Sequence, residues 1–284
     1  MSGKLFRNFS FFSATLSFFI LIGIFAVLFT YAQESMHQFG FHFLLTDQWQ
    51  PGEDDDGGVF GGFIPIMGTL MSTFIAMVIA TPLAMGIAIF LTEIASVAVA
   101  RPVSIAIELL AAIPSIIYGM WGLFYFAPIV QKTAGGDGVG LLTAGIVLAI
   151  MIIPFMASIT RDSMNTTPSV LKESAYAMGA TKYEVIKDVI MPYAKGGIIG
   201  SIILALGRAL GETMAVAFLI GSVMHTVKKI TDPTTSIPVL LANNFSEAQD
   251  LELSSMYYLA LVLFVVSFAI ISIAKFYFLG RKVK

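Results

Sequence analysis

Two ionisable residues stand four positions apart inside a long apolar stretch. The stretch 197–223 is predicted to be a membrane span, and Arg208 and Glu212 lie near its middle. Placing either residue type at a helix centre costs about 2.5–3.5 kcal/mol on insertion scales, so such residues persist where they face a bundle interior or water. Positions i and i+4 share a helix face, which predicts that the two side chains pair, although arginine before glutamate is the weaker order.

The chemistry available to a desolvated arginine is anion recognition. Guanidinium keeps its charge on burial, and its planar fork matches the oxygens of a tetrahedral oxyanion. Because Glu212 repels an anion placed directly against it, we assign this residue to orienting Arg208 and pairing with it at rest. The alternative is a purely structural ion pair between spans. Two Gly-x-x-x-Gly spacings in the same region allow another helix to approach closely: Gly196 with Gly200, and Gly207 with Gly211.

A charged segment, 161–196, precedes this span and is predicted to form two short helices. Thr167 is a suitable N-cap for the first helix. Gly179 can adopt the left-handed conformation that ends a helix. The apolar residues of the two pieces recur at helical spacing, so the segment has one apolar side.

The second piece begins with a capping-box pattern, Thr181-x-x-Glu184. Pro192 is expected to end it, because proline breaks a helix interior. From spacing alone, two interpretations of the segment are open: an amphipathic stretch lying on lipid, or a handle for a partner protein.

The composition places the whole chain in a membrane. Its 284 residues are 57% hydrophobic and 12% charged, whereas about a quarter of a soluble domain is charged. Apolar runs of about 20 residues predict one all-α domain, 1–284, that crosses the bilayer several times. The chain has no cysteine, which excludes disulfides and thiol catalysis.

Six spans are predicted, with both termini in the cytoplasm. Twelve Lys and Arg residues fall on the cytoplasmic side of this scheme and three outside, as the positive-inside rule requires. An outside loop, 33–62, ends in the acidic run Glu53–Asp56, and a polar loop precedes the last span. The predicted spans are 9–32, 63–91, 103–129, 139–160, 197–223 and 257–279.

Other candidate residues give weaker signals. Glu108, in the third span, either lines a transport path or interacts with the dipole at the helix N-terminus. The three histidines lack ligand spacing, so we predict no metal site, and we expect no cofactor. No Gly-x-x-x-x-Gly-Lys-Ser/Thr motif occurs, so the chain is not expected to hydrolyse ATP itself. A nucleophile–base arrangement is also missing, and we predict that the chain is not an enzyme.

The charged segment carries a recognisable signature. Glu173-Ser174-Ala175-x-x-x-Gly179, then nine residues and Val189-x-Met191-Pro192, resembles the Glu-Ala-Ala, Gly, Ile-x-Leu-Pro loop of ABC importer permeases. The chain departs from that signature at Ser174, Val189 and Met191. In that family the loop forms a coupling helix that docks on the ATP-binding subunit. The resemblance implies that Glu173 and Gly179 are central to docking, and it favours docking over lipid contact.

Two further stretches narrow the resemblance. Residues 207–216, Gly-Arg-Ala-Leu-Gly-Glu-Thr-Met-Ala-Val, and 112–122, Ala-Ile-Pro-Ser-Ile-Ile-Tyr-Gly-Met-Trp-Gly, are similar to phosphate-importer permeases of the PstC type. This similarity implies the transmembrane fold of a type I ABC importer, in the cytoplasmic membrane of a bacterium or archaeon.

The implied partners are a second permease in a heterodimer, two copies of an ATP-binding subunit and an external phosphate-binding protein. Phosphate is the implied substrate, and no nucleic acid is expected. Two alternatives stay open. One is a permease of a sulfate or molybdate importer, and the other is an ion-coupled secondary carrier with Glu212 as its proton site.

Overall fold

The computed structural model describes residues 3–51 and 58–279, which fold almost entirely into helices. The acidic run Glu53–Asp56 lies outside the described residues, as do the basic residues of the C-terminus. The chain divides into two compact units. Unit 1 comprises residues 1–63 and 241–266, and unit 2 comprises 64–240 and 267–284.

In unit 1, the described residues of the predicted outside loop, 33–51 and 58–62, form several short elements. Ser35 is fully buried, and its N–H donates to Ser254 Oγ at 3.1 Å. The Phe43 and Tyr258 rings stack with centroids 4.4 Å apart, so the start of the last long helix holds this segment in place. The elements are α1 (Gly3–Tyr31), α2 (Gln33–Phe39), a 3₁₀ turn (Gly40–Leu44), the antiparallel strands β1 (Trp49–Gln50) and β2 (Val59–Phe60), and the first part of α13 (Asp250–Leu279).

Unit 2 holds the predicted functional residues. Its helices are α3 (Phe63–Ile89), α4 (Val97–Ala111), α5 (Ser115–Trp121), α6 (Ala127–Ala134), α7 (Leu141–Asn165), α8 (Ser169–Ala177), α9 (Lys182–Glu184), α10 (Met191–Leu210), α11 (Met214–Ala217) and the first half of α12 (Ile237–Asn244). Three π-helical turns connect them at Phe90–Ile94, Gly122–Phe126 and Val185–Ile190.

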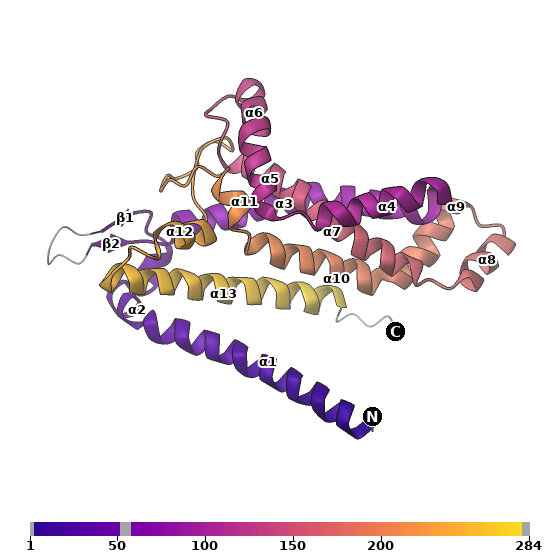
Figure 1. The fold of residues 1–284 in the computed structure, drawn as a ribbon, viewed down its shortest axis with the longest axis horizontal. Coiled ribbons are helices and arrows are strands. Elements are labelled where there is room, and N and C mark those ends of the chain that lie inside the picture. The colour runs from indigo at the N-terminus through magenta and orange to yellow at the C-terminus, as the bar shows by residue number, and fades with distance from the viewer. Residues whose placement is uncertain (1–2, 52–57, 280–284) are drawn as a thin grey trace. The chain divides into compact units, whose positions relative to one another are not determined.

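Helix α7 is the centre of unit 2, where it packs against α4 and α10 (Figure 1). Leu148 and Ile152 of α7 are buried in one cluster with Ala80 of α3 and Ala205 of α10. Small residues allow the close approach: a Cβ on Gly145 would lie 2.6 Å from Ile75 Cγ2. The apolar core of this unit therefore forms where α3, α7 and α10 meet.

The predicted membrane spans are present, and the third is bent. Among the described residues, five helices are long and apolar enough to cross a membrane, and a sixth span is obtained if α4 and the helical stretch 115–134 count as one. These two parts meet at 92°, so the span predicted over 103–129 is not one continuous helix. Pro114 explains the break, because it lacks an N–H and disfavours a helical conformation at Ile113. Figure 1 shows α6 turning away from α4.

Three predicted helix ends need correction. Pro192 does not end a helix: it lies in the first turn of α10, and helical structure runs from Lys182 to Leu210. The π turn before it shifts the hydrogen-bond pattern where proline has no N–H to donate. Thr167 is not the N-cap of α8, since Pro168 occupies that position. The fifth span ends at Leu210, well short of residue 223.

The loop before the last span is also less exposed than expected. Thr234 and Thr235 are almost completely buried. The N–H of Ile237 donates to Thr69 Oγ1 of α3 at 2.9 Å, and Gly68 leaves room for the carbonyl of Thr235. This loop therefore returns into unit 2 and completes its core.

Candidate functional site

Arg208 lies in the last turn of α10 and is half-buried. Its Cζ is 5.4 Å from the ring centroid of Phe155 on α7, a cation–π contact worth about 0.5–2 kcal/mol. The end of a helix also favours a cation through its dipole. Within 3–51 and 58–279, the ion pairs are Arg161–Glu108, Arg161–Asp162 and Lys172–Glu93, so Arg208 forms none with a carboxylate.

Glu212 does not pair with Arg208, and this expectation was wrong. Helix α10 ends at Leu210, so the two residues do not share a helical turn. Instead, Glu212 Oε1 accepts the N–H of Ala215 at 3.2 Å, at the start of α11. The carboxylate thus caps the next helix, and the guanidinium keeps its hydrogen-bonding capacity.

The two motif stretches 112–122 and 207–216 come together in space. Helix α5, from the first, packs against α11, from the second. A Cβ on Gly119 would lie 3.0 Å from Ala215 Cα, so only glycine allows this approach. Tyr118 of α5 is buried, and its hydroxyl donates to the carbonyl of Leu110 at 2.9 Å. The contact of Phe155 with Arg208 could not be read from sequence spacing, because the two residues lie on different helices.

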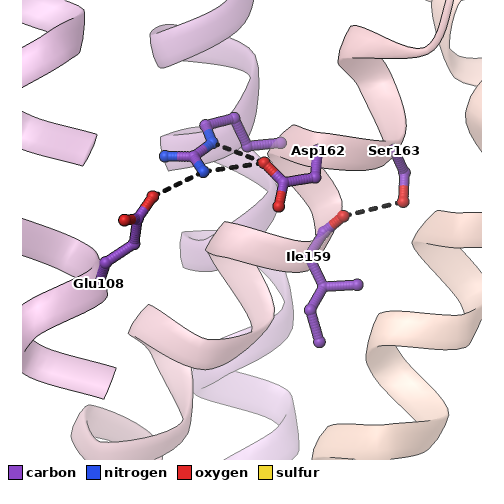
Figure 2. Close-up of polar contacts among 5 residues, drawn as sticks. Glu108, Ile159, Asp162 and Ser163 are labelled. Atoms are coloured by element: carbon purple, nitrogen blue, oxygen red, sulfur yellow. Dashed lines mark hydrogen bonds and ion pairs between the residues drawn. The ribbon is translucent and has the colours of Figure 1, made fainter. Parts of the chain in front are cut away.

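Glu108 belongs to a separate cluster at the end of α4 (Figure 2). The helix begins at Val97, so an interaction with the dipole at its N-terminus is excluded as the explanation of Glu108. Arg161 of α7 donates from Nη2 to Glu108 Oε1 at 2.9 Å and to Asp162 Oδ1 at 2.8 Å. Arg161 was not predicted as a site residue, because its partner Glu108 is 53 positions away in the chain. The cluster borders a cavity of about 450 Å³.

Four predicted coupling residues lie on α8 and the turn after it, whereas the fifth, Pro192, lies in the first turn of α10. Ala175 is buried, whereas Glu173 and Ser174 are exposed. Gly179 has a φ of +90°, and its missing Cβ would contact nothing within 4 Å. Glycine is therefore required there by backbone conformation and not by space.

The capping box at the start of the second helical piece is confirmed. Thr181 Oγ1 accepts the N–H of Glu184 at 3.4 Å, and the Thr181 N–H donates to Glu184 Oε2 at 2.7 Å. This reciprocal pair begins a new helix directly after Gly179. The chain reverses sharply between α8 and α9 as a result, beyond the ends of α7 and α10 (Figure 1).

The outer surface of α8 and α9 is rich in apolar side chains. Leu171 and Met178 recur at helical spacing with the buried Ala175, but both are exposed, and Met178 is 84% exposed. Clusters of this kind mark interaction surfaces. The exposed members are Val170, Leu171, Tyr176, Met178 and Tyr183.

The sequence of this chain is similar to a known family of transport proteins. Residues 84–284 match the family model for the binding-protein-dependent transport system inner membrane component. The phosphate transport system permease protein PstC of Pasteurella multocida is 45% identical over 95% of this chain and 90% of its own length. The protein of the same name from Mesorhizobium japonicum is 46% identical over 93% and 86%.

A solved structure has the same fold at low sequence identity. A chain of a bacterial alginate ABC transporter, in complex with an alginate-bound periplasmic protein, has a TM-score of 0.64. The match covers 96% of this chain and 94% of that one at 15% identity. The fold of an ABC transporter permease therefore extends over nearly the whole chain.

Proposed function

Because the chain belongs to the family of binding-protein-dependent transport system inner membrane components, we propose that it is the permease subunit of an ATP-driven importer of inorganic phosphate. Relatives that are 45% and 46% identical are named phosphate transport system permeases. The observation that carries the proposal is Arg208, a cation within a membrane-spanning helix that contacts an aromatic ring and forms no ion pair in the described part of the chain.

An Arg208 without a carboxylate partner can bind an oxyanion substrate better than an Arg208 that is already paired with Glu212. The Phe155 ring supports the guanidinium without using its N–H donors, and these donors match phosphate oxygens bidentately. Glu212 is held by the Ala215 N–H, so its charge is partly satisfied locally. Phosphate carries one or two negative charges near neutral pH, and we assign the remaining neutralisation to the second permease.

The predicted coupling residues support the proposal that a separate subunit hydrolyses ATP and docks on this chain. The chain has no P-loop, and we assign ATP hydrolysis to two copies of a partner subunit. These subunits dock on the exposed apolar surface of α8 and α9, with Glu173, Ser174 and Gly179 at the contact and Ala175 as the inner anchor. Pro192 lies in the helical path from Lys182 to Leu210, which links the docking surface directly to Arg208.

The remaining features of the complex follow from the same assignment. A second, different permease completes the path, and an external phosphate-binding protein delivers the substrate. Both termini lie in the cytoplasm, and the membrane is the cytoplasmic membrane of a bacterium or archaeon. Glu108 lies on the path through its cluster with Arg161, near the cytoplasmic end.

The test is phosphate uptake by the complete complex in proteoliposomes with ATP on the motor side. Arg208→Gln should reduce uptake at least about tenfold, because it removes charge-assisted hydrogen bonds worth about 1.5–3 kcal/mol each. Arg208→Lys keeps the charge but not the fork, so its uptake should be intermediate. Arg7→Gln, which changes an exposed arginine of α1, is the matched control. Normal uptake by the assembled Arg208→Gln complex refutes the role of this residue.

Two controls distinguish the alternatives. Competition by excess sulfate or molybdate, but not by arsenate, points to an importer of those anions. Uptake that persists without ATP and follows an ion gradient points to a secondary carrier, with Glu212→Gln as the variant that abolishes it.

A further inference from the structure

The coupling helix α8 has a polar contact with a membrane helix that none of the sequence motifs contains. Lys172 Nζ donates to Glu93 Oε1 at 2.5 Å. Glu93 lies in the π turn at the end of α3, 79 positions earlier in the chain. We propose that this ion pair is a second mechanical link, which passes the movement of α8 to α3 while the chain itself passes it to α10. The inference rests on the proposed function.

The burial of this pair separates it from ordinary surface ion pairs. The Glu93 side chain is 9% exposed and that of Lys172 is 24% exposed, whereas Glu108 in the other interhelical pair is 55% exposed. Solvent and salt screen a buried pair much less than an exposed one. Removing one partner leaves the other charge buried and unpaired, which is strongly unfavourable. We therefore infer that this ion pair keeps α8 in contact with the end of α3 when α8 moves.

An apolar contact lies beside the ion pair. Ala175 follows Lys172 by three positions, so both residues lie on the same side of α8. Ala175 is buried in a cluster with Ala88 of α3 and Met164 of α7. The inner side of α8 therefore contacts the end of α3 through one ionic and one apolar interaction, while its outer sides are exposed for a partner.

Helix α3 can carry a displacement into the core of unit 2. Ala80 and Ala84, further along the helix, are buried with residues of α7 and α10. The close approach of Ile75 to Gly145 leaves no space for α3 to slide independently of α7. Closely packed interiors transmit such shifts instead of absorbing them. A movement of α8 thus reaches the helices around Arg208 by two routes.

The experiment compares ATP hydrolysis with phosphate uptake in the same reconstituted complex. Lys172→Met keeps the length of the side chain but removes its charge, and Glu93→Gln does the same for its partner. We expect both variants to hydrolyse ATP, with the number of ATP molecules consumed per phosphate raised about tenfold. Lys172→Arg keeps the charge and should couple normally. Lys132→Met, an exposed lysine on α6, is the matched control.

A rescue experiment separates linkage from local stability. The exchange Glu93→Lys with Lys172→Glu should restore the wild-type ratio. Because the chain has no cysteine, cysteines placed at 93 and 172 can also be joined specifically by a short bismaleimide. The joined complex should couple, and the same complex before cross-linking should not, which decides the question even if a single charge variant fails to assemble.

The outcomes distinguish this inference from the proposed function. If the wild-type complex does not take up phosphate with ATP, the proposed function fails. If the wild-type complex does so and Lys172→Met has the wild-type ratio, only the ion-pair inference fails. A proportional fall in hydrolysis and uptake, or cross-linking that restores nothing, also overturns the inference.

Discussion

The guanidinium of Arg161 donates to the carboxylate of Glu108 at 2.9 Å, and this contact joins α7 to the C-terminal part of α4. Asp162 accepts two further bonds from the same guanidinium (Figure 2). One arginine thus serves two carboxylates. Its side chain is 13% exposed, whereas theirs are 55% and 63% exposed.

This difference in burial predicts that substituting Arg161 lowers the stability of the subunit more than substituting Glu108. Arg161→Met removes both ion pairs and leaves two carboxylates near each other, so we expect a loss of about 1–2 kcal/mol in stability. Glu108→Gln removes one exposed pair and should cost less than about 1 kcal/mol. Thermal unfolding of the purified subunit in detergent measures the difference. Equal costs for the two variants would contradict the shared role of Arg161.

Gly179 and Gly200 form a matched pair of glycine substitutions. A Cβ at either position would meet nothing within 4 Å, but only Gly179 has a positive φ, of +90°. Gly179→Ala should therefore cost about 1–2 kcal/mol through backbone strain. Gly200→Ala, within α10, should stabilise the isolated subunit by about 0.5–1 kcal/mol. Denaturation of both variants provides the check, and a stable Gly179→Ala protein would rule out the strained turn.

The contact between α7 and α10 depends on Gly197, next to the Gly-x-x-x-Gly spacing identified in the sequence. A Cβ at this position would lie 2.5 Å from Ser163 Cβ. Ser163 cannot turn away without losing its bond from Oγ to the Ile159 carbonyl, at 2.8 Å (Figure 2). Gly197→Ala should therefore destabilise the subunit by about 1–3 kcal/mol.

A second substitution tests the cause of that loss. Ser163→Gly in the Gly197→Ala background removes the clashing atoms, so the double variant should be more stable than the sum of the two single effects. A double-mutant cycle by thermal unfolding measures this coupling. Additive effects would show that the helices do not meet at these residues.

Asp232 predicts a pH dependence in the loop before α12. The N–H groups of Lys229 and Lys228 donate to Asp232 Oδ2 at 2.7 and 3.0 Å and hold the pKa of that carboxyl below its ordinary value of 3.8. A lowered pKa in the folded state means that the charged form stabilises the turn. This stabilisation is complete above the ordinary pKa and is lost as the pH falls through the folded-state pKa.

Hydrogen exchange can detect the change. Protection of the Lys228 and Lys229 amides should decrease as the pH is lowered from about 5 to 2, after correction for intrinsic exchange rates. Asp232→Asn should remove this dependence, because its side chain does not titrate. An unchanged pH profile in the Asn variant would show that other groups control the loop.

Local sequence patterns were sufficient for part of this protein. The lengths of the apolar runs predicted the membrane helices, and the described part of the chain has five helices long and apolar enough to cross a membrane, or six such spans with the bent pair. Thr181 and Glu184 formed the predicted capping box, because its two hydrogen bonds join residues three positions apart. The loop and span motifs also indicated the permease family that the comparisons show.

The partners of the charged residues were decided by tertiary structure. Spacing predicted an ion pair between Arg208 and Glu212, but α10 ends between them. The Arg208 guanidinium instead lies over the Phe155 ring, and the Glu212 carboxylate accepts a hydrogen bond from the Ala215 N–H.

The two interhelical ion pairs, Arg161–Glu108 and Lys172–Glu93, join residues 53 and 79 positions apart. Such contacts depend on which helix surfaces pack together, and helical periodicity gives the facing side of a helix without identifying its neighbour. The sequence therefore determined which residues could carry charge in and beside the membrane, and packing decided which of them are neutralised and which, like Arg208, form no ion pair in the described chain.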